Sequence, residues 1–223
     1  MKKSKVMLFG AMALTAGLAL AACGSSQSSN ADKTYSYIFV NNPDTLDYIT
    51  STRDSTSSIT TNLIDGLLEN DQYGNLIPSM AESWTVSKDG LTYTYKIRQG
   101  AKWYTSEGEE YADVTAHDFV TGLKYAADKK AENLYLVQDS IKGLADYVEG
   151  KSSDFGTVGV KAVDDYTLQY TLNQPETYWN SKTTASILSP VNEAFLKSKG
   201  DDFGSVTPSS ILSNGPYLFK SFT

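Results

Sequence analysis

Residues 84–98 constrain the fold most strongly, because a regular alternation of apolar and polar side chains follows a turn. Tyr93, Tyr95 and Ile97 alternate with polar residues, and residues 88–90 supply an Asp-Gly turn. A period of two places alternate side chains on one face of a strand, and Asp-Gly favours a tight connection. The sequence therefore predicts a β-hairpin with one apolar face and one solvated face.

A second hairpin and a capped helix give the next clearest patterns. Residues 158–163 and 166–172 are strand-like stretches separated by two aspartates. Thr115 and Asp118 form a Thr-x-x-Asp variant of the capping box, which marks the start of a helix. The stripe of this helix expected to face the core is Phe119, Leu123, Ala126 and Ala127. Strands and helices mixed in this way indicate an α/β fold.

Shorter patterns predict further elements. Aromatic and β-branched residues 34–40 indicate a first strand, which residues 41–44 end with turn chemistry. Helices are expected over residues 57–68, with Asp54 and Ser55 as cap candidates, over residues 141–148 and over residues 191–199. Residues 217–222 resemble a strand without a following turn, so we expect this strand to pair with an earlier one or the sequence to be a fragment.

The first 22 residues have the composition of an export signal. Three lysines precede an apolar run over residues 6–22, which is shorter than the ~20 residues of a spanning helix. A permanent transmembrane helix is therefore the weaker interpretation. Leu20 and Cys23, separated by two small residues, resemble the lipobox of bacterial lipoproteins. The resemblance implies that Cys23 carries two acyl chains, which together hold a protein on a bilayer; the alternative is a secretory signal with an incidental cysteine.

Composition limits the partners of the remaining chain. Residues 24–30 contain only Gly, Ser, Gln and Asn, so residues 23–34 are expected to form the lipidated cysteine and a flexible tether. Removal of residues 1–22 takes away three lysines and no acid, which lowers the formal charge from −7 to −10. Nucleic acid and an anionic membrane surface are therefore poor partners. A single cysteine excludes an internal disulfide, so packing alone must hold the fold.

Catalytic and metal-binding patterns are weak. Residues 143–152 place six residues between two glycines, where a phosphate-binding loop has four. His117 is the sole histidine and lacks a Gly-x-Ser-x-Gly partner, so we expect it to face solvent. Glu107, Glu109 and Glu110 form the one dense carboxylate cluster and are expected in a solvated turn. We predict no enzymatic activity, no cofactor and no metal site.

Residues 81–103 closely resemble the signature of the extracellular solute-binding proteins that serve peptide ABC importers. The match fixes Trp84, the turn at residues 89–90, Arg98 and Gly100 at set offsets. Further stretches resemble elements of the family in the same order, and these are residues 43–47, 113–119, 165–172, 174–175 and 214–217. The pattern covers residues 35–223 and is most similar to the oligopeptide-binding lipoproteins of the Opp/Ami/Ali type in Gram-positive bacteria.

The resemblance implies a periplasmic-binding-protein-like α/β fold of type II, in which two lobes close on the ligand. A small extra subdomain carries the signature hairpin. By similarity, residues 35–64 and 189–223 would belong to lobe I, and residues 65–188 to the extra subdomain. Members of the family are several hundred residues longer, so we expect this chain to be an N-terminal fragment. The acidic group that anchors the peptide amine in some relatives belongs to the absent half.

Relatives bind the peptide as an additional extended strand, with main-chain hydrogen bonds for affinity and roomy pockets for varied side chains. The loop after the first strand supplies one side of this pairing. The positions here that match it are Thr52, Arg53, Asp54 and Ser55. The alternative is a plain surface loop with an N-cap at Asp54. We also expect Tyr135 to form an aromatic wall of the cleft, and Asn214 with Gly215 to form its floor.

The resemblance therefore predicts a lipid-anchored receptor on the extracellular face of the cell membrane. It would capture oligopeptides as a monomer and deliver them to a membrane ABC permease with its ATPase subunits. Two alternatives stay open. The same fold could bind another solute, such as a nickel chelate or haem, or it could serve a peptide-sensing surface adhesin lipoprotein.

Overall fold

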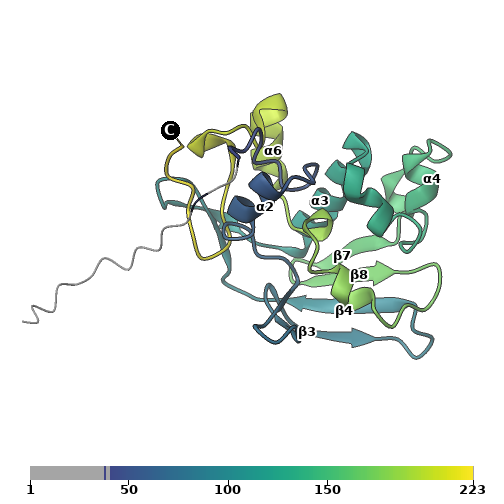
Figure 1. The fold of residues 1–223 in the computed structure, drawn as a ribbon. Helices are drawn as coiled ribbons and strands as arrows, with labels where there is room; N and C mark the ends of the chain where they lie inside the picture. Colours follow the sequence, from purple (N-terminus) through teal and green to yellow (C-terminus); the bar gives the residue numbers. More distant parts are fainter. Residues whose placement is uncertain (1–37, 39–40, 223) are drawn as a thin grey trace, which may run out of the picture. The chain divides into compact units, whose positions relative to one another are not determined.

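A computed structural model describes residues 38 and 41–222 (Figure 1). The strands are β1 (Leu68–Asn70), β2 (Leu76–Pro78), β3 (Ala81–Val86), β4 (Thr92–Ile97), β5 (Lys102–Tyr104), β6 (Glu110–Asp113), β7 (Val160–Asp164) and β8 (Thr167–Thr171). The α-helices are α2 (Asp54–Thr60), α3 (Ala116–Lys129), α4 (Leu144–Val148), α5 (Trp179–Lys182) and α6 (Glu193–Lys199). Short 3-10 helices are η2 (Glu132–Leu136), η3 (Phe155–Thr157), η4 (Ser186–Leu188), η5 (Gly200–Asp202) and η6 (Pro208–Ser210).

Several expectations concern residues 1–37, which lie outside the described part of the chain. These are the export signal, Cys23, the tether and nearly all of the strand over residues 34–40. Among the described residues, no helix has the length and apolarity that crossing a membrane requires.

The two predicted hairpins form one antiparallel sheet in the order β3-β4-β8-β7. β4 and β8 join them, with Tyr93 opposite Tyr170 and Tyr95 opposite Leu168. The turn of the first hairpin is as predicted, because Gly90 adopts a φ of 73° and donates its N–H to the Ser87 carbonyl at 2.9 Å. Two smaller hairpins pair β1 with β2 and β5 with β6.

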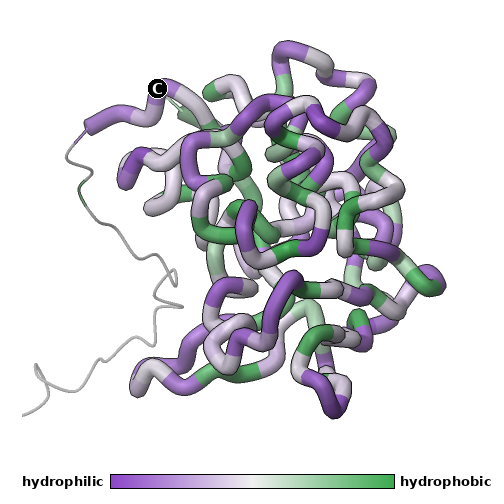
Figure 2. The backbone as a smooth tube through the Cα atoms, turned by 90° about the vertical axis from the view of Figure 1, so that its right-hand side faces the viewer, coloured by the Kyte–Doolittle hydropathy of each residue, from purple (hydrophilic) through white to green (hydrophobic). Residues whose placement is uncertain are grey.

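One face of this sheet is apolar and buried, as the alternation predicts. Tyr95, Leu168 and Tyr170 are fully buried on it, and Trp179 of α5 packs against the Tyr170 ring with centroids 5.3 Å apart. Each such side chain stabilises the fold by about 1.5–3 kcal/mol relative to exposure. The opposite face is polar, with Thr94 paired to Gln169. Figure 2 shows the corresponding mixture of hydrophilic and hydrophobic positions along the chain.

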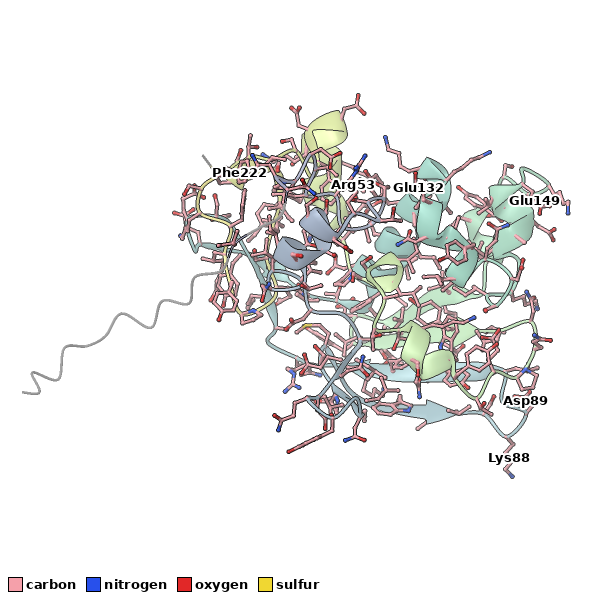
Figure 3. All side chains as sticks on the ribbon, in the orientation of Figure 1. Arg53, Lys88, Asp89, Glu132, Glu149 and Phe222 are labelled. Atoms are coloured by element: carbon pink, nitrogen blue, oxygen red, sulfur yellow. The ribbon has the colours of Figure 1, made fainter. Side chains whose placement is uncertain are left out.

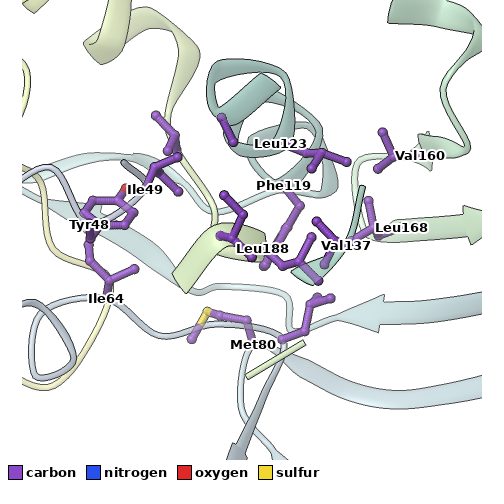
Figure 4. Packing of buried hydrophobic residues seen from close by; sticks show 14 of the residues in the cluster. Tyr48, Ile49, Ile64, Met80, Phe119, Leu123, Val137, Val160, Leu168 and Leu188 are labelled. Carbon is purple, nitrogen blue, oxygen red and sulfur yellow. The ribbon is translucent and has the colours of Figure 1, made fainter. Parts of the chain in front are cut away.

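The α3 helix covers the apolar face near β7 and β8. Its capping box is confirmed, with the Thr115 N–H donating to the Asp118 carboxylate at 2.9 Å. Phe119 and Leu123 are fully buried and lie beside the sheet residue Leu168 in Figure 4. After α3, Lys130 takes a left-handed conformation with φ 51°, which turns the chain into η2.

The predicted helix over residues 57–68 is wrong in its extent. The α2 helix ends at Thr60, and Leu68 begins β1. The Leu63 carbonyl accepts the N–H groups of Asn214 at 3.0 Å and Gly215 at 2.8 Å, so tertiary bonds replace a continued helical ladder. Leu63, Ile64, Leu67 and Leu68 are nevertheless buried, which is why their spacing resembles that of a helix.

Other boundaries also differ from the expectations. The helix expected over residues 141–148 is confined to α4, because Ile141 forms a β-bridge with Leu172 instead. The helix expected over residues 191–199 is confirmed as α6, with Gly200 following it. The strand expected over residues 217–222 is wrong, since that segment is irregular and its Tyr217 N–H bonds to the Asn62 carbonyl at 3.2 Å.

Candidate functional site

One buried carboxylate, that of Asp47, holds the loop that precedes α2. Its oxygens accept the N–H groups of Ile49 and Thr50 at 3.1 Å, and the hydroxyl groups of Thr50 at 2.6 Å and Tyr125 at 2.9 Å. Burial and the Asp47 charge raise the pKa of the Tyr125 hydroxyl. Gly204 packs against this loop so closely that a Cβ added to Gly204 would lie 2.5 Å from the Asp47 backbone nitrogen. Interior contacts therefore fix the loop backbone.

The predicted ligand loop runs from Thr52 to the first turn of α2. Arg53 occupies the N-cap position and Asp54 is the first helical residue, so the predicted caps at Asp54 and Ser55 are wrong by one or two positions. The Thr52 hydroxyl donates to the Glu132 carboxylate at 2.9 Å, and Arg53 Nε lies 3.0 Å from Asp44 Oδ2. Thr52, Arg53 and Asp54 are exposed and Ser55 is half-buried. These polar side chains are therefore accessible at the start of α2.

The η2 segment contains Tyr135 and is bonded to this loop through Glu132. Glu132 is the first residue of η2 and Tyr135 follows three residues later, with 72% of its surface exposed. Figure 3 shows Glu132 on the element next to Arg53. The Thr52–Glu132 hydrogen bond thus connects two segments that the sequence separates by 80 positions. Glu132, which sequence reasoning missed, therefore bonds the predicted loop to the segment that carries Tyr135.

Asn214 and Gly215 lie at the other end of α2. The Asn214 side chain accepts the Asp65 N–H at 3.0 Å and donates to the Asp65 carbonyl at 3.1 Å. An added Cβ on Gly215 would lie 2.9 Å from the carbonyl carbon of Leu63, so the close approach of the two chains requires glycine. Both residues have clear structural roles here, and their contact with a ligand stays a prediction.

A cavity of about 330 Å³ adjoins Asp65, and sequence reasoning did not identify it. Burial raises the pKa of the Asp65 carboxyl, and the nearby Glu69 charge adds to this effect. The cavity therefore combines an acidic wall with hydroxyl groups, which suits polar or cationic groups. Its other polar lining residues include Tyr48, Thr60, Thr61, Ser79, Thr184, Ser186 and Ser189.

The remaining chemical candidates behave as surface groups. His117 is exposed and lies 3.2 Å from Asp165, as expected for a solvent-facing residue. Glu107, Glu109 and Glu110 are also exposed, as predicted. Within residues 38 and 41–222, no group of three His, Cys, Asp or Glu side chains is arranged to hold a metal ion.

The sequence is similar to those of known bacterial solute-binding proteins. Residues 75–223 match the family described as bacterial extracellular solute-binding proteins, family 5, middle. The chain is 66% identical over 219 residues to the oligopeptide-binding protein AliB of Streptococcus pneumoniae serotype 4, covering 98% of this chain and 33% of AliB. The chain therefore spans about a third of the length of the curated relatives it matches.

Solved structures give the same result for the fold. Listeria monocytogenes OppA bound to peptide has a TM-score of 0.71 and 33% identity, covering 78% of this chain and 33% of that one. Haemophilus influenzae OppA in complex with RPPGFSPFR has a TM-score of 0.72 and 30% identity, covering 82% and 34%. The expected α/β substrate-binding fold is confirmed, and the chain belongs to the bacterial extracellular solute-binding proteins of family 5.

Proposed function

We propose that this protein captures extracellular oligopeptides and delivers them to a membrane ABC permease with its ATPase subunits. The high identity to an oligopeptide-binding protein supports this function. Peptide capture by this family requires no covalent chemistry, which agrees with the exposed position of the sole histidine.

The observation that carries the proposal is the Thr52–Glu132 hydrogen bond, which links the loop to the η2 segment that contains Tyr135. It joins a polar loop to an exposed aromatic ring, and such a combination can accept a peptide main chain while it packs against varied side chains. Because the contact is exposed, we expect it to contribute only about 1 kcal/mol, so a bound peptide can replace it. The loop over Thr52, Arg53, Asp54 and Ser55 would form one side of the cleft.

The proposal also assigns residue ranges to the lobes of the fold. Residues 35–64 and 189–223 would form lobe I, and residues 65–188 the extra subdomain. The four-stranded sheet supports this division, since all its strands fall between Ala81 and Thr171. Asn214 and Gly215 would lie at the cleft floor beside the cavity at Asp65.

Acid extraction tests the ligand class. Protein purified from its native source without denaturation should release a mixture of short peptides, seen by mass spectrometry. A spectrum without peptides, or with a metal chelate or haem in their place, would overturn the proposal.

A matched pair of tyrosine variants tests the site. In the full-length protein, Tyr135→Ala should weaken binding of the nonapeptide RPPGFSPFR by about tenfold, which corresponds to roughly 1.4 kcal/mol, because removal of the exposed ring would take away its proposed contact with the ligand. Tyr73→Ala is the control, since Tyr73 is 80% exposed on the β1–β2 turn and should leave affinity unchanged. Calorimetry on both variants decides the matter, and equal affinities would exclude Tyr135 from the site.

The lipid anchor is the last part of the proposal. Cys23 would be diacylated and would hold a monomeric protein on the extracellular face of the cell membrane. Cys23→Ser should shift the protein from the membrane fraction to the soluble fraction. Retention of the variant on membranes after high-salt washing would refute the anchor.

A further inference from the structure

The polar face of the four-stranded sheet carries a small cavity that the peptide function does not use. We call it the Lys142–Lys161 pocket, after two lysines that line it. Its volume is about 200 Å³, below the roughly 300 Å³ at which pockets for drug-sized ligands begin. The pocket is therefore of a size for a single small group rather than a peptide. Other lining residues are Thr157, Gly159, Gln169 and Thr171.

Hydrogen bonds hold the backbones of the two lysines in place. The Lys142 N–H donates to the Thr171 carbonyl at 3.0 Å, and the Lys142 carbonyl accepts the Gly159 N–H at 2.7 Å. Lys161 is fixed by its pairing with Gln169 in the β7–β8 ladder. An added Cβ on Gly159 would lie 2.3 Å from the Thr171 oxygen and 3.0 Å from the Lys142 Cβ, so only glycine allows Lys142 to pack this closely.

The charge of the pocket is unbalanced. Throughout the described residues, neither Lys142 nor Lys161 has a carboxylate within 4.0 Å, whereas nearby Lys151 pairs with Glu149 at 2.6 Å. None of the described residues that line the pocket is acidic, and Asp154, two residues before the lining residue Gly156, accepts the Gly156 N–H at 2.8 Å. Two lysines without a carboxylate partner therefore line one pocket in a chain with a formal charge of −7. They attract an anion by Coulomb interaction.

Neutral donors complete the site. The Thr171 hydroxyl makes no hydrogen bond to any other described residue, so it is available to a ligand. The Gln169 amide donates to the Thr94 hydroxyl at 3.1 Å, which orients its side chain across the sheet. Lys142, Lys161 and Thr171 carry donors on three separate backbone positions of the lining. Donors on separate positions suit a tetrahedral oxyanion, whereas a carboxylate offers oxygens in one plane only.

We propose that the Lys142–Lys161 pocket binds a phosphate group. The ligand is either inorganic phosphate or the phosphodiester of a lipid headgroup, which share this chemistry. Binding is independent of peptide capture, because the pocket lies on the polar face of the sheet and the peptide loop belongs to α2 and η2. Since both lysines are exposed, binding weakens as ionic strength rises.

Nuclear magnetic resonance on the purified protein provides the test. Inorganic phosphate, titrated at constant ionic strength against chloride, should shift the backbone amide signals of Gly159 and Lys161 saturably. Lys142→Gln and Lys161→Gln should each weaken the response at least tenfold, and Lys161→Arg should retain it because the positive charge remains. Lys88→Gln is the matched control, since Lys88 is an exposed lysine on the β3–β4 turn that does not line the pocket (Figure 3).

Vesicles distinguish the two sources of phosphate. In a sedimentation assay, phosphatidylglycerol vesicles compete with inorganic phosphate for the pocket if headgroups bind, and phosphatidylcholine vesicles report binding to a neutral surface. If phosphate shifts the amide signals and the protein does not sediment with phosphatidylglycerol vesicles, the ligand is the free anion. If the protein sediments with phosphatidylglycerol vesicles and this depends on Lys142 and Lys161, the ligand is the lipid headgroup. Equal shifts with chloride and phosphate, or lysine variants that respond like the unmodified protein in both assays, would overturn the proposal.

Discussion

Asp118 offers a quantitative test of how burial and hydrogen bonding compete in this fold. The carboxyl is 5% exposed and one of its oxygens accepts both the Trp103 indole N–H at 3.1 Å and the Thr115 N–H at 2.9 Å. Burial raises the pKa of Asp118 to about 6 from 3.8, although these hydrogen bonds act in the opposite direction. Protonation of Asp118 therefore favours the folded state.

The direction of the pH dependence follows from this shift. Between pH 3.8 and about 6 the folded protein binds the Asp118 proton more tightly than the unfolded chain does. The stability contributed by the protonated carboxyl is thus present below pH 3.8 and is lost as the pH rises through about 6. A shift of about two units corresponds to about 3 kcal/mol in the free energy of unfolding.

The Asp118→Asn variant isolates this effect because asparagine keeps an acceptor oxygen for both donors and cannot ionise. Relative to the unmodified protein, the variant should gain about 3 kcal/mol in unfolding free energy between pH 4 and pH 7. Urea denaturation at several pH values measures the unfolding free energies of the two proteins. Taking their difference cancels the contributions of all other acidic groups. Asp201→Asn is the control, because the Asp201 side chain is fully exposed.

Two outcomes would refute the reasoning. Parallel stability profiles for Asp118→Asn and the unmodified protein would mean that Asp118 titrates alike in the folded and unfolded states. A relative loss of stability in the variant as the pH rises would mean that the helix N-terminus and hydrogen bonds outweigh burial.

Three further predictions concern packing and can be checked by the same urea denaturation. Tyr170→Phe should leave stability unchanged or raise it, because the buried Tyr170 hydroxyl has no hydrogen-bond partner among the described residues. Tyr95→Phe should lower stability by about 1 kcal/mol, because it removes the hydrogen bond to Asn180. Equal effects of the two substitutions would contradict this prediction. Gly122→Ala should destabilise by at least about 3 kcal/mol, since its Cβ would lie 2.2 Å from the Ser189 oxygen, and a smaller loss would show that α3 can shift. Gly74→Ala should cost only about 1–2 kcal/mol, because its φ of 81° strains alanine but its surroundings are open, and a loss as large as that of Gly122→Ala would refute this.

The sequence predicts local elements well where one face is buried and a turn has distinct chemistry. Both hairpins and the capped start of α3 meet these conditions, so alternation and capping identify them. The end of α2 does not, because it depends on Asn214 and Gly215, which lie about 150 positions away and compete for the Leu63 carbonyl. No local pattern contains that information.

The same limit applies to the candidate site. Thr52 and Tyr135 could be selected from the family resemblance, yet Glu132, which connects their segments, has no sequence signal beyond being an acid in a polar stretch. The cavity at Asp65 is likewise formed by residues from several separate segments, including Ser79 and Ser189. Only the fold shows which of the many hydroxyl-bearing residues line the same cavity.

The rim of the proposed cleft combines a fixed backbone with replaceable side-chain contacts. Asp47 holds the loop through buried bonds to its own backbone and to Tyr125, so the loop does not need a ligand to define its shape. The Arg53–Asp44 pair is exposed on both sides and contributes at most about 1 kcal/mol, so a ligand can displace it at little cost. A preformed main chain lowers the entropic cost of binding, while weakly held side chains adapt to different partners. This division of roles agrees with the proposed capture of peptides of varied sequence.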